Sequence, residues 1–111
     1  MKKRRAIKVI RLGGELEIGR KNEIRESLAS SGDAAAVLLD LGTVTYADSI
    51  ALTELLRFCA EAARNDRPVA LVVQTPQFAR LVQYAGLANA FKIFSESAAA
   101  MEYLGECARE S

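Results

Sequence analysis

Two short apolar runs with an amphipathic segment between them most constrain how this chain can fold. Residues 36–41 read AVLLDL, with Asp40 the only polar residue, and residues 69–73 read VALVV. Because neither run alternates apolar with polar residues, each predicts a strand that is covered on both faces. Over residues 49–64, apolar side chains recur at helical spacing, and charged ones, Glu54 among them, are expected on the opposite, solvent face.

Weaker patterns predict the other elements before the long helix. Residues 6–12 and 15–18 are expected to be two short strands that pair back on each other across a turn at Gly13-Gly14. Residues 20–30 predict a thinly amphipathic helix. The stretch from Gly42 to Asp48 is expected to be a loop that leads into the helix at Ser49, and Asp40 is expected to brace that loop.

Three further elements are predicted after the second apolar run. A helix begins at Thr75-Pro76, with the threonine hydroxyl as its cap, and stops at Gly86. A short strand is expected over residues 91–94. Ser95 is expected to cap the last helix.

Strands that alternate with amphipathic helices predict a single α/β domain. We expect a mixed, mainly parallel sheet joined by right-handed crossovers and covered by amphipathic helices, over residues 6–104. The chain length of 111 residues suits one such domain. Residues 1–5 (MKKRR) are expected to form a flexible basic tail, and residues 105–111 to fray.

The composition argues against most kinds of enzyme. The chain has no histidine and two cysteines, so it lacks Ser-His-Asp and Cys-His pairs and cannot build a four-thiolate metal site. No GxxxxGK[ST] or GxGxxG phosphate loop is present. We therefore expect no catalytic function, no cofactor and no bound metal. Cys59 is expected to be a core thiol and Cys107 a thiol in the terminal segment.

Charge and hydropathy limit the partners. A formal net charge of +1 argues against direct nucleic-acid binding, and no apolar run approaches the ~20 residues of a membrane-spanning helix. The expected location is the cytoplasm, where both thiols stay reduced.

Asp48 and Ser49 are the residues best placed for a function. They stand where a loop meets the first turn of the long helix, and the first amides of a helix lack partners within it. Either side chain can act as an N-cap, which stabilises a helix by ~1 kcal/mol. A phosphate on Ser49 would also be accommodated there, because the helix dipole favours negative charge at this end. The residues alone leave both interpretations open.

Four segments, in this order, resemble the STAS domain of the bacterial anti-sigma-factor antagonists. They are GELE at residues 14–17, LDL at 39–41, VTYADSIAL at 44–52 and LVQYAGL at 81–87. The resemblance spans residues 6–104. It implies a phosphorylation-switched binding module in which Ser49 is the phosphoryl acceptor.

The implied partner is an anti-sigma factor with serine kinase activity, and a serine phosphatase resets the switch. The unphosphorylated chain would hold the anti-sigma factor, and the phosphorylated chain would release it. In this family an acid after GEL lies beside the acceptor and touches the partner, which implies that role for Glu17. Ile50 and Ala51 replace the usual small residue and glycine; Ile50 is expected to anchor the partner, and the Ala51 methyl to hinder a kinase's approach. The full set of residues expected to bind the partner is Glu17, Tyr46, Asp48, Ile50, Ala51 and Thr53.

Two alternatives remain open. One is a STAS subunit that is not phosphorylated and packs in a membrane lipid or anion transporter assembly, with the transporter's ATPase subunit as partner. The other is a phospho-aspartate receiver domain with Asp40 as acceptor. That chemistry needs an acidic pair after the first strand and a lysine after the last, whereas Gly13-Gly14 occupies the first place and Lys92 lies within the last strand.

Overall fold

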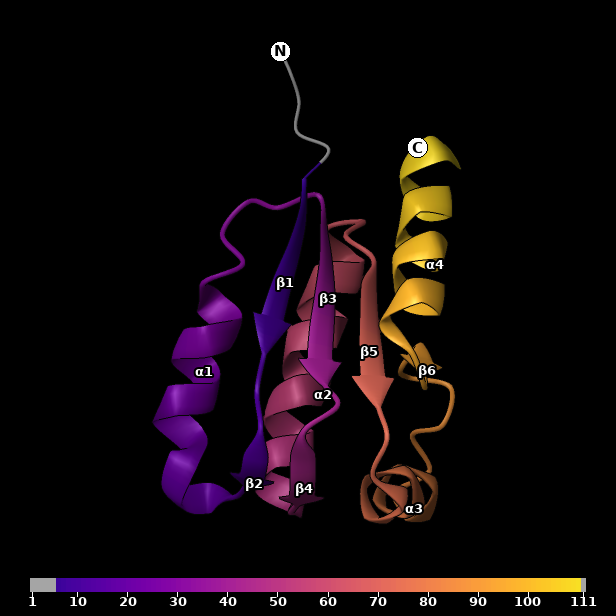
Figure 1. The fold of residues 1–111 in the computed structure, drawn as a ribbon. Helices are drawn as coiled ribbons and strands as arrows, with labels where there is room; N and C mark the ends of the chain where they lie inside the picture. The colour runs from indigo at the N-terminus through magenta and orange to yellow at the C-terminus, as the bar shows by residue number, and fades with distance from the viewer. Residues whose placement is uncertain (1–5, 111) are drawn as a thin grey trace.

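The structure is a computed structural model that describes residues 6–110, with side chains described as far as Ala108. The predicted basic tail at residues 1–5 lies outside the described residues. The strands β1 (Ile7–Arg11), β3 (Ala36–Leu41), β5 (Val69–Val73) and β6 (Ile93–Phe94) form one sheet in the order β1-β3-β5-β6. All of its neighbouring strands are parallel (Figure 1). The predicted α/β class with a mainly parallel sheet is confirmed.

A second ladder lies beyond the carboxyl ends of β1 and β3. It pairs β2 (Gly14–Leu16) with β4 (Val44–Ala47), again in parallel (Figure 1). Two expectations are therefore wrong: the second segment does not pair back on the first strand, and the stretch from Gly42 to Asp48 contains a strand. Gly14, at a φ of +72°, bends the chain without reversing it. The Gly14 amide donates to the Thr43 carbonyl at 3.1 Å, and this bond keeps β2 aligned with the segment that leads into β4.

Helices cover both faces of the main sheet. Helices α1 (Lys21–Ala29) and α2 (Ser49–Arg64) pack on one face, and α4 (Ser97–Glu110) packs on the other. The split follows the alternation of side chains along a strand: Val37 and Leu39 face the first layer, whereas Leu38 faces α4. Helix α3 (Pro76–Tyr84) contacts β4 at the carboxyl end of the sheet (Figure 1).

The predicted helix boundaries are right in the centre of the chain and less accurate toward its end. Helix α2 spans the predicted residues 49–64, and α3 ends at Tyr84, two residues before the predicted stop at Gly86, whose φ is +73°. The Thr75 side chain does not cap α3; its hydroxyl donates to the Val44 carbonyl, which fastens α3 to β4. Helix α4 begins at Ser97, so Ser95 lies outside it and is not its N-cap.

Residues 105–110, for which the sequence predicts fraying, are helical in the structure, since α4 continues to Glu110. Ala100 and Leu104 are fully buried against the sheet and anchor the helix just before that point. A lone glycine at position 105 costs a helix only about 1 kcal/mol, which this packing offsets.

Candidate functional site

The β2–β4 ladder delivers the chain to the amino end of α2. Asp48 is the N-cap of this helix: its backbone is extended, with φ −101° and ψ 179°, and its Oδ1 accepts the Ala51 amide at 2.9 Å. Its own amide donates to the Leu16 carbonyl at the end of β2, at 3.0 Å. The start of α2 is therefore fixed both by its cap and by the neighbouring strand.

Ser49 is the first residue of α2, and its side chain has no structural task among residues 6–110. The residue is exposed, and its hydroxyl makes no hydrogen bond within this part of the chain. The Ser49 carbonyl, in contrast, accepts the Thr53 hydroxyl at 2.8 Å. Capping thus belongs to Asp48, and the Ser49 hydroxyl is presented to solvent at the positive end of the helix.

The second oxygen of Asp48 holds a residue that sequence reasoning missed. Oδ2 accepts the amide of Ile18 at 3.0 Å, and Ile18 is 62% exposed. Ile18 begins η1, the single 3-10 turn at Ile18–Arg20 that joins β2 to α1. The sequence predicted that Ile18 ends a short strand over residues 15–18, so an exposed isoleucine next to the start of α2 was not foreseen.

The structure brings most of the predicted partner-binding residues to one end of the molecule. Glu17, Tyr46 and Asp48 line a shallow hollow of about 380 Å³ together with Glu15. Tyr46 is 45% exposed, so this surface combines carboxylates with apolar area. These residues come from the β2–β4 ladder, the residue that follows β2 and the N-cap of α2, so it is the pairing of β2 with β4 that brings them together.

On α2 itself the predictions divide. Thr53 is exposed and Ile50 half-buried, so both can be reached by another protein. Ala51 is fully buried, with 0% of its surface exposed. Its predicted contact with a partner is wrong, and its methyl group cannot hinder a kinase, because it points into the core and not toward solvent. Alanine, which replaces the usual glycine of the family at position 51, therefore packs its methyl group in the core.

Asp40 serves the loop that follows it, as expected. Its Oδ1 accepts the Gly42 amide at 3.0 Å, and its Oδ2 pairs with the Nε of Arg11 at 3.2 Å. Both oxygens are thus engaged in local structure. The described residues contain no cluster of three or more potential metal-ligating His, Cys, Asp or Glu side chains. A receiver-type site at Asp40 finds no support in this arrangement.

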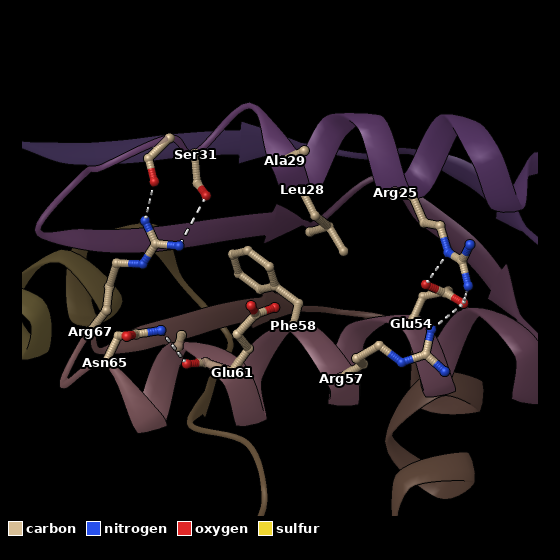
Figure 2. Close-up of a pocket in the computed structure, with 12 residues that line it drawn as sticks. Arg25, Leu28, Ala29, Ser31, Glu54, Arg57, Phe58, Glu61, Asn65 and Arg67 are labelled. Atoms are coloured by element: carbon tan, nitrogen blue, oxygen red, sulfur yellow. Dashed lines mark hydrogen bonds and ion pairs between the residues drawn. The ribbon is translucent and has the colours of Figure 1, made fainter.

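A larger groove of about 650 Å³ lies between α1 and α2 (Figure 2). At one end, Glu54 accepts two hydrogen bonds from Arg25, Nε to Oε1 at 2.9 Å and Nη2 to Oε2 at 3.2 Å. Only 4% of Glu54 is exposed, so its expected place on the solvent face is wrong. The hydrogen bonds from Arg25 hold the pKa of the Glu54 carboxyl below its usual value of 4.5. This pair fastens α1 to α2.

At the other end of the groove, Arg67 closes the loop after α1. Its guanidinium donates to the Ser31 hydroxyl and the Gly32 carbonyl, and it lies 5.9 Å from the centre of the Phe58 ring (Figure 2). The groove is therefore bounded at one end by a contact between α1 and α2, and at the other by contacts between the loop after α1 and the loop that joins α2 to β5.

Two further properties bear on function. The Cys59 thiol lies against the core, as expected, and burial raises its pKa to about 12. Over residues 6–110, no helix combines the length and the apolar character needed to span a bilayer.

Comparison with known proteins identifies the fold family. The family model of the STAS domain matches residues 1–100. No curated protein sequence matches the chain. An anti-sigma factor antagonist from Mycobacterium paratuberculosis superposes with a TM-score of 0.81 at 17% identity, over 93% of this chain and 89% of that one.

Two other solved structures show how widely this fold is used. A sulfate transporter family protein from Wolinella succinogenes gives a TM-score of 0.80 at 13% identity, over 93% of this chain and 88% of the other. The phosphorylated form of the Bacillus cell fate determinant SpoIIAA gives 0.67 at 22% identity, over 89% and 92%. These likenesses establish a shared fold, and the family model covers nearly the whole chain: this chain belongs to the STAS domain family.

Proposed function

We propose that this chain is an anti-sigma-factor antagonist that works as a phosphorylation-switched binding module in the cytoplasm and has no catalytic activity of its own. With Ser49 unmodified, it holds an anti-sigma factor that is also a serine kinase, which frees the sigma factor. When the kinase phosphorylates Ser49, the complex separates, and a serine phosphatase restores the binding form.

The observation that carries this proposal is the state of the Ser49 hydroxyl. It is exposed at the first position of α2 and has no hydrogen-bond partner within residues 6–110. A kinase can reach such a hydroxyl without unfolding the helix, because the cap of α2 is supplied by Asp48. Exposed apolar side chains at Ile18 and Tyr46, 62% and 45% accessible, give the same end of the molecule the character of a protein-binding surface.

A phosphate on Ser49 would act on the complex more than on the fold. It adds a charge of about −1.5 to −2 at the amino end of a helix, where the dipole stabilises it by ~0.3–1 kcal/mol. A partner that covers this surface must desolvate that charge beside the carboxylate of Asp48 and make room for its bulk. A loss of ~1.4 kcal/mol in binding already lowers affinity tenfold.

The comparisons add support of a general kind. One similar structure is of an anti-sigma factor antagonist, and another is of SpoIIAA in a phosphorylated form. Both share the fold of this chain, so the proposed partner class and modification agree with the descriptions of these two proteins.

Affinity capture from the native cell, followed by mass spectrometry, tests the proposal. Wild type and Ser49→Ala are expected to retain an anti-sigma factor with an ATP-binding kinase domain, and Ser49→Asp to lose it. Phosphate is expected on Ser49 of the wild type. The matched control is Ser97→Asp, since Ser97 is also exposed and also the first residue of a helix, α4. If Ser49→Asp captures the same proteins as wild type, the switch is refuted.

A second candidate is a STAS subunit of a membrane lipid or anion transporter assembly. The similar structure of a sulfate transporter family protein favours it, as does isoleucine at position 50 beside Ser49. In that case the captured protein is a transporter ATPase subunit, no phosphate is found on Ser49, and Ser49→Asp has no specific effect.

A further inference from the structure

We propose that Asp48 is a positioning residue that holds Ile18 and the first turn of α2 together as one docking surface, and that Ile18 enters an apolar recess of the partner. This inference rests on the proposed function and extends it, because it names a contact residue and the side chain that positions it.

The geometry of one carboxylate carries the argument. Oδ1 of Asp48 accepts the Ala51 amide at 2.9 Å, and Oδ2 accepts the Ile18 amide at 3.0 Å. The first bond fixes α2 at the turn that presents Ser49. The second bond fixes η1, whose first residue, Ile18, lies 30 positions before Asp48 in the sequence. A capping role alone needs the first bond and leaves the second unexplained.

Ile18 needs such a bond because its side chain contributes little to holding it in place. It is 62% exposed, and η1 is a single turn of three residues without a side-chain cap. The other end of this turn is tied to the bend before β2 and to β2 itself: Arg20, the last residue of η1, donates from Nη1 to the Gly13 carbonyl at 2.6 Å and to the Glu15 carbonyl at 2.9 Å. Among the hydrogen bonds of residues 6–110, the Asp48 carboxylate is the side chain that links η1 to α2.

An isoleucine that is fixed in an exposed position loses little further freedom on binding. Burying it in a partner removes apolar surface from water, and the backbone beneath it is already ordered. Since the same carboxylate fixes the turn that carries Ser49, a partner that senses the Ser49 hydroxyl lies across Ile18 as well. The partner that covers Ile18 is therefore the proposed anti-sigma factor. Ile18 enters an apolar recess of the anti-sigma factor, beside the part of that protein's surface that contacts Ser49.

Asp48→Asn separates the two bonds. Asparagine caps helices about as well as aspartate, so its single carbonyl oxygen can still accept the Ala51 amide. Its amide group then faces the Ile18 amide, donor against donor, and the link to η1 is lost. Hydrogen exchange by NMR is expected to show the Ile18 amide exchanging at least tenfold faster in this variant, with the amides of α2 beyond its first turn unchanged.

Binding to the protein captured by wild type in the experiment above supplies the second measurement. Ile18→Ala and Asp48→Asn are each expected to weaken binding at least tenfold, and the double variant no further, because Asp48 acts through Ile18. Met101→Ala is the matched control: Met101 is 40% exposed but lies on α4, on the other face of the sheet, and its loss is expected to leave binding unchanged.

The outcomes distinguish this inference from the proposed function. If Asp48→Asn or Ile18→Ala binds within twofold of wild type while Ser49→Asp does not bind, the inference is wrong and the switch stands. Additive losses in the double variant, or an Ile18 amide that stays protected in Asp48→Asn, also overturn it. If Ser49→Asp binds as wild type does, the proposed function itself has failed.

Discussion

Alanine substitutions at the neighbouring residues Asp48 and Ser49 are expected to differ sharply in their effect on stability. Asp48 makes two side-chain hydrogen bonds to backbone amides, at 2.9 and 3.0 Å. Ser49 makes none with its side chain among the described residues. The difference provides a direct measurement of which residue holds the start of α2 and which is available for modification.

The magnitudes follow from these bonds. Loss of an N-cap costs about 1 kcal/mol, and loss of a further hydrogen bond to a charged group costs about 1.5 kcal/mol. Asp48→Ala is therefore expected to lower the free energy of unfolding by about 2–3 kcal/mol, which at this chain length lowers Tm by about 8–12 °C. Ser49→Ala removes an exposed hydroxyl and is expected to change Tm by no more than about 2 °C.

Thermal unfolding followed by circular dichroism, together with urea denaturation, checks both values. Ser49→Asp belongs in the same series: its charge gains from the helix dipole and is opposed by Asp48, so its net effect is expected to stay within about 1 kcal/mol. A fall in Tm for Ser49→Ala as large as that for Asp48→Ala would refute the reasoning, since it would show that the serine hydroxyl stabilises the helix.

Three other substitutions or measurements test the fold around the site. The pKa of Glu54 is lowered by its hydrogen bonds from Arg25, so its contribution to stability is present above the unfolded pKa of 4.5 and is lost as pH falls through the lower folded pKa. Urea midpoints at pH 7 and pH 3 are expected to show Glu54→Gln less stable at neutral pH and less sensitive to acid; equal acid sensitivity would contradict the pairing. The Cys59 thiol, whose pKa burial raises to about 12, is expected to react with iodoacetamide at pH 8 only on unfolding, as mass spectrometry of the labelled peptide would reveal. Gly14→Ala forces a side chain into a φ of +72° and is expected to cost about 1–2 kcal/mol in a thermal melt; an unchanged Tm would mean that the β1–β2 bend is not strained.

The elements with strong internal patterns could be predicted from the sequence, and those defined by their partners could not. Helix α2 and strands β3 and β5 have the predicted bounds, because each buries a continuous stripe or run of apolar residues. Strand β4 is only four residues, VTYA, with two of them exposed. Nothing local distinguishes such a segment from a loop; it is a strand because β2 lies beside it.

The same limit explains the site. Asp48 and Ser49 were found because a helix start has a sequence signature. Ile18 was missed because its backbone is bound by Asp48, a residue 30 positions away, a contact that has no local sequence signature. Glu54 was misplaced because its burial depends on Arg25, which lies on another helix. Apolar periodicity reports which face of an element is covered, but it cannot report which polar side chain finds a buried partner.

A one-residue offset decides whether modification of this helix start would act on the fold or on an interface. Had the serine been the N-cap, its hydroxyl would be consumed by a backbone amide, and phosphorylation would remove a stabilising bond. Here the aspartate at position 48 takes that role through Oδ1, and the serine stands one position later with its hydroxyl unused. Charge added at Ser49 leaves the cap in place and meets a favourable dipole, so the protein tolerates it. A partner that covers the same surface has no such compensation. Phosphorylation is therefore expected to weaken binding of the partner more than it changes the stability of the fold.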